Sequence, residues 1–273
     1  MSQPKIAFIG AGNMAKAIIG GLISEGFSPE NLSASGPRME YLNKIADEFG
    51  INVNTDNAAV SAQADVIVLA VKPQMLKEVV LGLAGSLDHK LLIISLAAGI
   101  TTDSIANWLA ADHAIVRCMP NTPSQVRVGA SGLFANKHVS ETQKSYANAI
   151  LGAVGIVQWV DDEALINPVT AVSGSGPAYF FLMMEAMIDA GVELGLSRES
   201  ARELTLQTAL GAAILAKQSD VDVAELRRRV TSPKGTTEQA INSFENDQIR
   251  AIFARAMQAC SNRAVELSEI LGK

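Results

Sequence analysis

Short apolar runs alternate with helical patterns through the first half of the chain. Residues 6–9, 65–71, 91–95 and 114–119 are almost entirely apolar, as is typical of strands buried on both faces of a sheet. Residues 13–25 carry apolar positions at helical spacing, and strand and helix patterns keep alternating after them. Small or rigid residues follow the runs, so the pattern predicts an α/β fold with a doubly wound, mostly parallel sheet.

The pattern changes at residue 161. Strands near 131–135 and 157–160 and a helix over 140–153 complete the first domain, and no convincing strand pattern follows them. Helices are predicted over 163–172, 177–194, 198–217, 222–230, 237–245 and 247–271. The sequence therefore predicts a sheet domain over residues 1–160 and an all-helical domain over residues 161–273.

Some helices of the second domain are apolar on nearly every side, most clearly over 178–187 and 204–215. A helical domain of about 110 residues cannot bury all of these faces by itself. We therefore expect a homodimer that forms by helix-on-helix packing of this domain.

The opening stretch resembles a dinucleotide-binding fingerprint. The first apolar run is followed by Gly10-Ala-Gly12-Asn13-Met14-Ala15. Gly10 suits a tight turn, Gly12 lets the backbone approach a pyrophosphate, and Ala15 keeps the next helix close to the strand. Asn13 and Met14 begin that helix, whose N–H groups would face the phosphates. A Rossmann-type domain that binds a dinucleotide is predicted; a pure packing role for the glycines is the alternative.

The residues after the second strand, expected at 31–35, bear on the choice of cofactor. Enzymes that use NAD commonly have an acid at this place, but here Ser35 and Arg38 come before the first acid, Glu40. A hydroxyl and a guanidinium suit a 2′-phosphate, which favours NADPH and leaves NADH as the weaker possibility. Arg38 could instead be solvated in the first turn of the next helix.

Further cofactor contacts are expected where the later strands end, because ligands of such sheets lie beyond the carboxyl ends of the strands. The candidates there are Ala70, Val71, Lys72, Pro73, Ala97, Ala98, Gly99 and Asn121.

Composition and charge narrow the class of function. The 273 residues are 48% hydrophobic and carry 22 basic and 28 acidic side chains, a net charge of −6. Nucleic acid and anionic membranes are therefore unexpected partners, and a small ligand is favoured. No window holds the roughly 18 apolar residues of a membrane helix, and no signal-peptide pattern opens the chain, which favours a cytoplasmic location. Cys118 and Cys260 lie far apart in no metal-ligand spacing, so we expect reduced thiols and no metal.

Two stretches of small residues interrupt the helices of the second domain. One is 173–178, where Pro177 fits the first helical position and Ser175 is a candidate for contact with the substrate. The other is 231–239, where Thr236 and Gln239 have the spacing of a capping box. The turn before that helix would offer backbone N–H groups to a carboxylate, with a threonine hydroxyl at the neighbouring heteroatom. Alternatively, both stretches are only turns and caps.

The positions of the histidines indicate which bond is reduced. His89, His113 and His138 all lie in the first domain, so the imidazole that usually protonates a carbonyl is missing from the expected substrate half. A protonated imine needs no such donor, because hydride addition neutralises its charge. Reduction of C=N is therefore favoured over reduction of C=O. Lys234 is the competing acid, although beside Gly235 it is expected to be solvated.

Taken together, the motifs resemble those of pyrroline-5-carboxylate reductase, over nearly the whole chain. The matching motifs begin at Gly10, Ala70, Ala97, Pro120, Ser173 and Thr231, in the family's order and spacing. The resemblance implies NAD(P)H-dependent reduction of 1-pyrroline-5-carboxylate to L-proline, the last step of proline synthesis. It also implies interlocked dimers that can assemble further.

The resemblance extends to single residues. It implies that Thr237 bonds the ring nitrogen and that Asn57 contacts the cofactor. It further implies a carboxylate site lined by Ser232, Gly235 and Thr236. One departure is Lys234, where the family commonly has glycine, so that a cation lies beside the proposed carboxylate site.

Two other functions are compatible with parts of the pattern. A β-hydroxyacid-type dehydrogenase would use a lysine of the second domain as its acid, and Lys217 and Lys234 are almost the only choices. A redox-sensing protein that holds NADPH without turnover would leave the 231–237 loop without a purpose.

Overall fold

The computed structural model describes residues 3–88 and 91–273, which form two compact units. One unit is Met1–Ser175 with Ala259–Lys273, and the other is Gly176–Gln258. The predicted division after residue 160 separates strands from helices and stays a prediction, whereas the compact units place residues 161–175 and the chain's end with the sheet. His89 lies outside the described residues.

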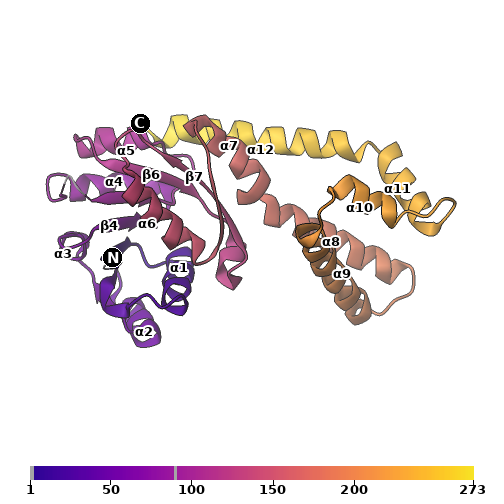
Figure 1. Cartoon of the computed structure of the whole chain (residues 1–273), viewed down its shortest axis with the longest axis horizontal. Coiled ribbons are helices and arrows are strands. Elements are labelled where there is room, and N and C mark those ends of the chain that lie inside the picture. Colours follow the sequence, from indigo (N-terminus) through magenta and orange to yellow (C-terminus); the bar gives the residue numbers. More distant parts are fainter. Residues whose placement is uncertain (1–2, 89–90) are drawn as a thin grey trace. The chain divides into compact units, whose positions relative to one another are not determined.

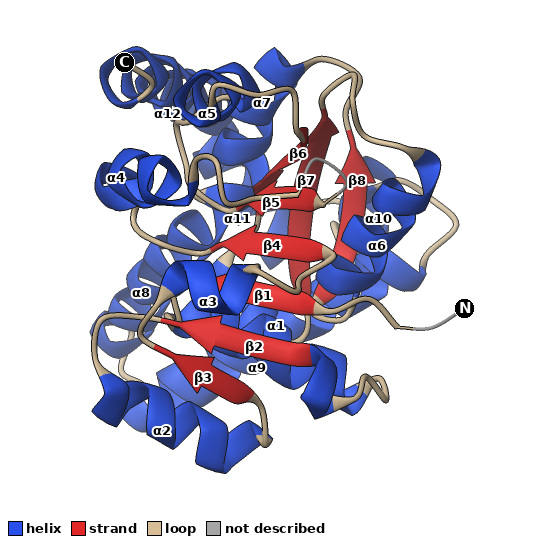
Figure 2. Cartoon of the chain, turned by 90° about the vertical axis from the view of Figure 1, so that its left-hand side faces the viewer, coloured by secondary structure: helices blue, strands red, loops and turns tan. Residues whose placement is uncertain are grey.

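The first unit, which contains the strands labelled in Figure 1, is built on an eight-stranded sheet. The strand order is β3-β2-β1-β4-β5-β6-β7-β8 (Figure 2). Its strands are β1 (Ile6–Ile9), β2 (Leu32–Ser35), β3 (Asn52–Asn54), β4 (Val66–Leu69), β5 (Leu92–Ser95), β6 (Ala114–Met119), β7 (Gly129–Ala135) and β8 (Gly155–Trp159). Strands β1 to β6 pair in parallel, β7 is antiparallel to β6, and β8 is parallel to β7. The predicted mostly parallel sheet is confirmed, and β1, β4 and β5 are buried at every position.

Helices cover both faces of the sheet (Figure 2). Helices α1 (Asn13–Ser24), α2 (Met39–Phe49) and α6 (Glu141–Gly152) pack on one face, and α4 (Pro73–Leu83) and α5 (Thr102–Leu109) pack on the other. Ile6 and Phe8 of β1 belong to the first core, and Ala7 and Ile9 belong to the second. This alternation shows why an uninterrupted apolar run was needed.

After β8 the described chain contains no strand, as predicted. Its helices are a 3₁₀ turn (Glu163–Leu165), α7 (Ile166–Val169), a π-helical turn (Thr170–Gly174), α8 (Gly176–Glu193), α9 (Arg198–Gln218), α10 (Val223–Arg229), α11 (Thr236–Asn246) and α12 (Ile249–Leu271). The single helix predicted over 163–172 is thus wrong in detail, because the chain changes helix type twice there. Pro177 is the second residue of α8 rather than the first.

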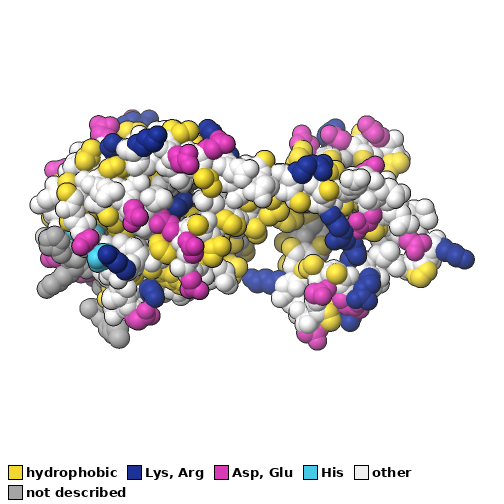
Figure 3. Space-filling model, turned by 90° about the horizontal axis from the view of Figure 1, so that it is seen from above, with side chains coloured by type: hydrophobic (Ala, Val, Ile, Leu, Met, Phe, Trp, Pro, Cys, Tyr) yellow, Lys and Arg dark blue, Asp and Glu magenta, His cyan; other side chains and the backbone are white. Residues whose placement is uncertain are grey.

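Large apolar side chains are exposed on the helical unit (Figure 3). The most exposed on α8 and α9 are Phe180, Phe181, Leu182, Leu204, Leu210 and Leu215, each more than half exposed. This is far more apolar surface than a folded monomer usually leaves in contact with water. No helix in the described part of the chain is long and apolar enough to cross a membrane.

Both cysteines are free thiols. Cys118 in β6 is buried, and Cys260 in α12 is half-buried. Burial raises the pKa of the Cys118 thiol, so this side chain stays neutral.

Candidate functional site

Gly10 is required by close packing at the tips of three strands. Its φ is 96°, its N–H donates to the Ser35 carbonyl at 3.0 Å, and a Cβ would lie 2.8 Å from the backbone of Ala70. Side chains other than hydrogen are therefore excluded by the fold itself. The turn after β1 is consequently held against the ends of β2 and β4.

Gly12 lacks any such restriction. Its φ is −74°, and a Cβ placed on it would meet no atom within 4 Å. It is the N-cap of α1, and no side chain caps the N–H groups of the first turn, which includes Asn13 and Met14. Open space in front of an uncapped helix N-terminus fits a phosphate, because the N–H groups and the helix dipole both favour negative charge.

The polar residues after β2 are arranged differently from expectation. Ser35 is fully buried, and its hydroxyl donates to Oδ1 of Asn57 at 2.7 Å. Asn57 begins the short helix α3 (Asn57–Ser61), whose N-cap Asp56 accepts from two backbone N–H groups. This hydrogen bond turns Oδ1 of Asn57 toward Ser35, so the amide NH₂ is the end that can donate to a ligand. Arg38 is the exposed N-cap of α2, and its guanidinium lies 5.9 Å from the ring centroid of Tyr41.

The remaining strand-end candidates divide by accessibility. Ala70 and Val71 are half-buried after β4, Lys72 is the exposed N-cap of α4, and Pro73 begins that helix. In the β5–α5 loop (residues 96–101), Ala97 and Gly99 are buried and Ala98 is half-buried. All of these residues lie at the carboxyl edge of the sheet, on the side where α1 begins.

The Asn121 side chain links two segments of the protein by hydrogen bonds. It is 9% exposed, its Oδ1 accepts the Ala130 N–H at 2.9 Å, and its Nδ2 donates to the Ser173 carbonyl at 3.1 Å. Each end of the amide thus makes a hydrogen bond within the chain, which holds Ser173 beside β6. The contact between Asn121 and a cofactor stays a prediction.

Ser175 follows the π-helical turn, a helix type often found at functional positions. Its hydroxyl accepts from the Cys260 thiol at 3.3 Å. Gly174 leaves room for the Met119 side chain at the end of β6, which a Cβ on residue 174 would overlap. Ser175 therefore belongs to the sheet-containing unit and not to the unit that carries the 231–237 loop.

The 231–237 loop joins α10 to α11. The two helices are linked by Glu245 near the end of α11, which accepts from Arg227 of α10 at 3.1 Å and from Nη2 of Arg250 at 2.7 Å. The hydrogen bonds from Arg250 are the main reason that the pKa of Glu245 is lowered. Thr231 adds a hydrogen bond from its hydroxyl to the Arg227 carbonyl at 2.6 Å. The loop is thus held on a scaffold made by α10, α11 and the start of α12.

The predicted capping box of Thr236 and Gln239 is wrong. The helix begins at Thr236, so this threonine lies in the first turn and Gly235 is the N-cap, without a side-chain cap. The carboxylate of Glu238 instead accepts the Lys234 N–H at 2.8 Å. Lys234 has φ 61°, a left-handed conformation that glycine adopts without strain.

The loop gathers the predicted substrate residues at one uncapped helix N-terminus. Ser232, Thr236 and Thr237 are exposed and Gly235 is half-buried. The first-turn N–H groups of Thr236 and Thr237 have no side-chain cap. Exposed hydroxyls beside free N–H groups can bind a carboxylate and a neighbouring polar atom at once.

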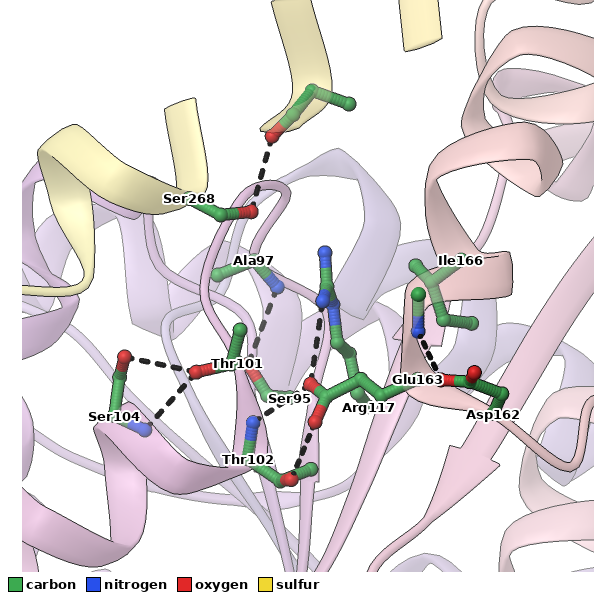
Figure 4. Close-up of polar contacts among 12 residues, drawn as sticks. Ser95, Ala97, Thr101, Thr102, Ser104, Arg117, Asp162, Glu163, Ile166 and Ser268 are labelled. Atoms are coloured by element: carbon green, nitrogen blue, oxygen red, sulfur yellow. Dashed lines mark hydrogen bonds and ion pairs between the residues drawn. The ribbon is translucent and has the colours of Figure 1, made fainter. Parts of the chain in front are cut away.

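One buried network was missed by the sequence analysis. Glu163 receives hydrogen bonds from Thr102 and Arg117, and Figure 4 shows its carboxylate between them. The signal for it was Arg117, a cation in the otherwise apolar strand 114–119, which requires a buried partner. The identity of the partner, 46 residues away, could not be read from the pattern.

Comparisons with known proteins agree on one family. Residues 163–267 match the family model described as pyrroline-5-carboxylate reductase dimerisation, and residues 5–99 match that of NADP oxidoreductase, coenzyme F420-dependent. The chain is 57% identical to the pyrroline-5-carboxylate reductase of Pseudomonas aeruginosa over the full length of both.

Two solved structures are also similar. A pyrroline-5-carboxylate reductase from Coxiella burnetii has a TM-score of 0.94 and 47% identity, covering 98% of this chain and 99% of that one. The Plasmodium falciparum pyrroline carboxylate reductase with NADP bound has a TM-score of 0.86 and 32% identity, with the same coverage.

Proposed function

The chain belongs to the pyrroline-5-carboxylate reductase family, and we propose that its sheet unit binds NADPH while the 231–237 loop binds the imino acid. The reaction is reduction of the C=N bond of 1-pyrroline-5-carboxylate to give L-proline. NADPH supplies the hydride when it is bound. The chain's own residues bind, orient and shield the two reactants.

The cofactor assignment rests on the open space at Gly12. The uncapped N–H groups of Asn13 and Met14 would face the pyrophosphate there, while Gly10 holds the turn in place. A similar solved structure contains NADP, and residues 5–99 match an NADP oxidoreductase model. The other proposed contacts are Ala70, Val71, Lys72, Pro73, Ala97, Ala98 and Gly99.

NADPH is the proposed cofactor in preference to NADH. The Asn57 amide NH₂, oriented by the buried Ser35 hydroxyl, and the exposed Arg38 guanidinium are donors suited to a 2′-phosphate. Ser35 therefore acts through Asn57 rather than by a contact of its own. No carboxylate comes from this loop before Glu40 to repel a phosphate.

The observation that carries the substrate assignment is the uncapped N-terminus of α11 with an exposed threonine hydroxyl beside it. The N–H groups of Thr236 and Thr237 would receive the carboxylate of the imino acid, with Ser232 and Gly235 lining the site. The hydroxyl oxygen of Thr237 would accept a hydrogen bond from the protonated ring nitrogen. That nitrogen already holds the proton that proline keeps, so no histidine is required. Ser175 is proposed as a further substrate contact.

The test is the oxidation of NADPH, followed by its absorbance, with pyrroline-5-carboxylate as substrate. Replacing Thr237 by Ala removes the hydroxyl aimed at the nitrogen and should lower kcat/KM more than tenfold, while Thr237→Ser should retain most of the activity. The dissociation constant for NADPH should be unchanged in both variants. A near-normal rate for Thr237→Ala would mean that this threonine only begins a helix.

The assembly is proposed to be a homodimer formed by the C-terminal helices. The match to a dimerisation model and the exposed apolar residues of α8 and α9 support it. Association of dimers into a larger oligomer is compatible with the same surfaces. A cytoplasmic location stays a prediction from the sequence.

A further inference from the structure

We propose that Glu163 and Arg117 are positioning residues for the cofactor. Acting through Thr102, they hold the β5–α5 loop in the shape that NADPH needs. The proposal rests on the assignment of Ala97, Ala98 and Gly99 to the cofactor site.

The Glu163 carboxylate closes the end of this loop with three hydrogen bonds. Its Oε1 accepts the Thr102 backbone N–H at 2.8 Å, and its Oε2 accepts the Thr102 hydroxyl at 2.7 Å. Nη1 of Arg117 donates to the same Oε1 at 3.2 Å. Thr102 is the first residue of α5, so the carboxylate also lies at a helix N-terminus, where negative charge is favoured.

The Arg117–Glu163 ion pair is largely buried, and this burial restricts its movement. The side chain of Arg117 is 4% exposed and that of Glu163 is 18% exposed. Burial lowers the pKa of Arg117, and the charge of Glu163 opposes this effect. A buried guanidinium cannot leave its carboxylate without losing its compensation, so the carboxylate is held at one place between β6 and α5.

The loop is also held at its other end and along its middle. The Ser95 hydroxyl, at the end of β5, accepts the Ala97 N–H at 3.4 Å. Gly99 has φ 73°, and a Cβ on it would lie 3.0 Å from the Leu267 Cβ of α12. At the end of the loop, the N-cap Thr101 accepts the Ser104 N–H at 3.1 Å within α5, and Glu163 is the contact that ties the first residue of this helix to β6 (Figure 4).

The same carboxylate orients a second candidate segment. Glu163 begins the 3₁₀ turn that leads through α7 to Ser175. Holding Glu163 against β6 and α5 therefore sets the point from which this segment leaves the sheet. Neither Glu163 nor Arg117 needs to touch a reactant for these effects.

The test compares Glu163→Gln with the wild-type enzyme. The amide keeps the size of the side chain, but its NH₂ group cannot accept the hydrogen of the Thr102 hydroxyl, and it places no negative charge beside Arg117. We expect the dissociation constant for NADPH, measured by fluorescence titration, to rise at least fivefold. The KM for the imino acid at saturating NADPH should change less than twofold. Glu141→Gln, which removes an exposed acid paired with Lys144, is the matched control and should change neither value.

A second variant guards against a failure to fold. Thr102→Val removes one of the three hydrogen bonds and leaves the Glu163–Arg117 pair intact, so it should raise the same constant about two- to threefold. NADPH affinity within twofold of wild type in both variants, with only a lower unfolding temperature, would overturn the proposal. The wild-type titration tests the proposed function by itself, because a wild type that does not bind NADPH would contradict that function. The variants then test only the positioning role of Glu163 and Arg117.

Discussion

Two glycines of the opening fingerprint should respond in opposite ways to the same substitution. Gly12→Ala adds a Cβ that meets no protein atom within 4 Å, at a φ of −74° that alanine adopts freely. Gly10→Ala adds a Cβ 2.8 Å from the backbone of Ala70, at a φ of 96°. The fold should therefore tolerate the first change and resist the second.

The magnitudes follow from these geometries. For Gly12→Ala, the lower entropy of the unfolded chain stabilises by about 0.4–1 kcal/mol, and alanine at an N-cap costs a similar amount. The net change in the free energy of unfolding should stay within about 1 kcal/mol. For Gly10→Ala, the backbone strain alone costs about 1–3 kcal/mol. The close contact with Ala70 adds to it, so we expect a loss of at least about 2 kcal/mol.

Gly12→Ala, which the fold tolerates, should nevertheless weaken the binding of NADPH. A methyl group at Gly12 fills the space in front of the helix N-terminus and keeps a phosphate from its N–H groups. Losing one charge-assisted hydrogen bond costs about 1.5–3 kcal/mol, so the dissociation constant for NADPH should rise at least tenfold.

The assays are urea unfolding for stability and fluorescence titration for NADPH. Gly82→Ala in α4, where a Cβ also meets no atom within 4 Å, is the matched control and should leave NADPH binding unchanged. NADPH affinity within twofold of wild type in Gly12→Ala would refute the assignment of this space to the pyrophosphate. A Gly10→Ala variant as stable as wild type would refute the packing argument.

Two further predictions concern the helical unit. Lys234→Gly removes the strain of a left-handed backbone at φ 61°, which stabilises the folded state, and it raises the conformational entropy of the unfolded chain, which destabilises it. The free energy of unfolding should therefore change by less than about 1 kcal/mol. The KM for the imino acid should change less than tenfold, and a larger change would mean that the lysine side chain contacts substrate. Gel filtration at micromolar concentration should show a dimer, which Leu210→Glu on the exposed apolar side of α9 should weaken. A monomeric wild type would contradict the dimer.

The sequence by itself determined the elements and the order of the fold. The central strands β1 and β4 are runs such as 66–69 in which every side chain is apolar, because both faces of the sheet are covered. The fingerprint at Gly10 and Gly12 and the small-residue stretches at 173–178 and 231–239 were likewise visible. These signals are local, since they arise from backbone periodicity and turn preferences within a few residues.

The roles of individual polar side chains were decided by the tertiary structure. The pattern could not show that the Ser35 hydroxyl is buried against Asn57, or that both ends of the Asn121 amide are used within the protein. Glu163 lies 61 residues from Thr102 in sequence. Hydrogen-bond partners so far apart are brought together only when the sheet and its helices pack, and the sequence pattern records which side chains are polar but not which groups they will meet.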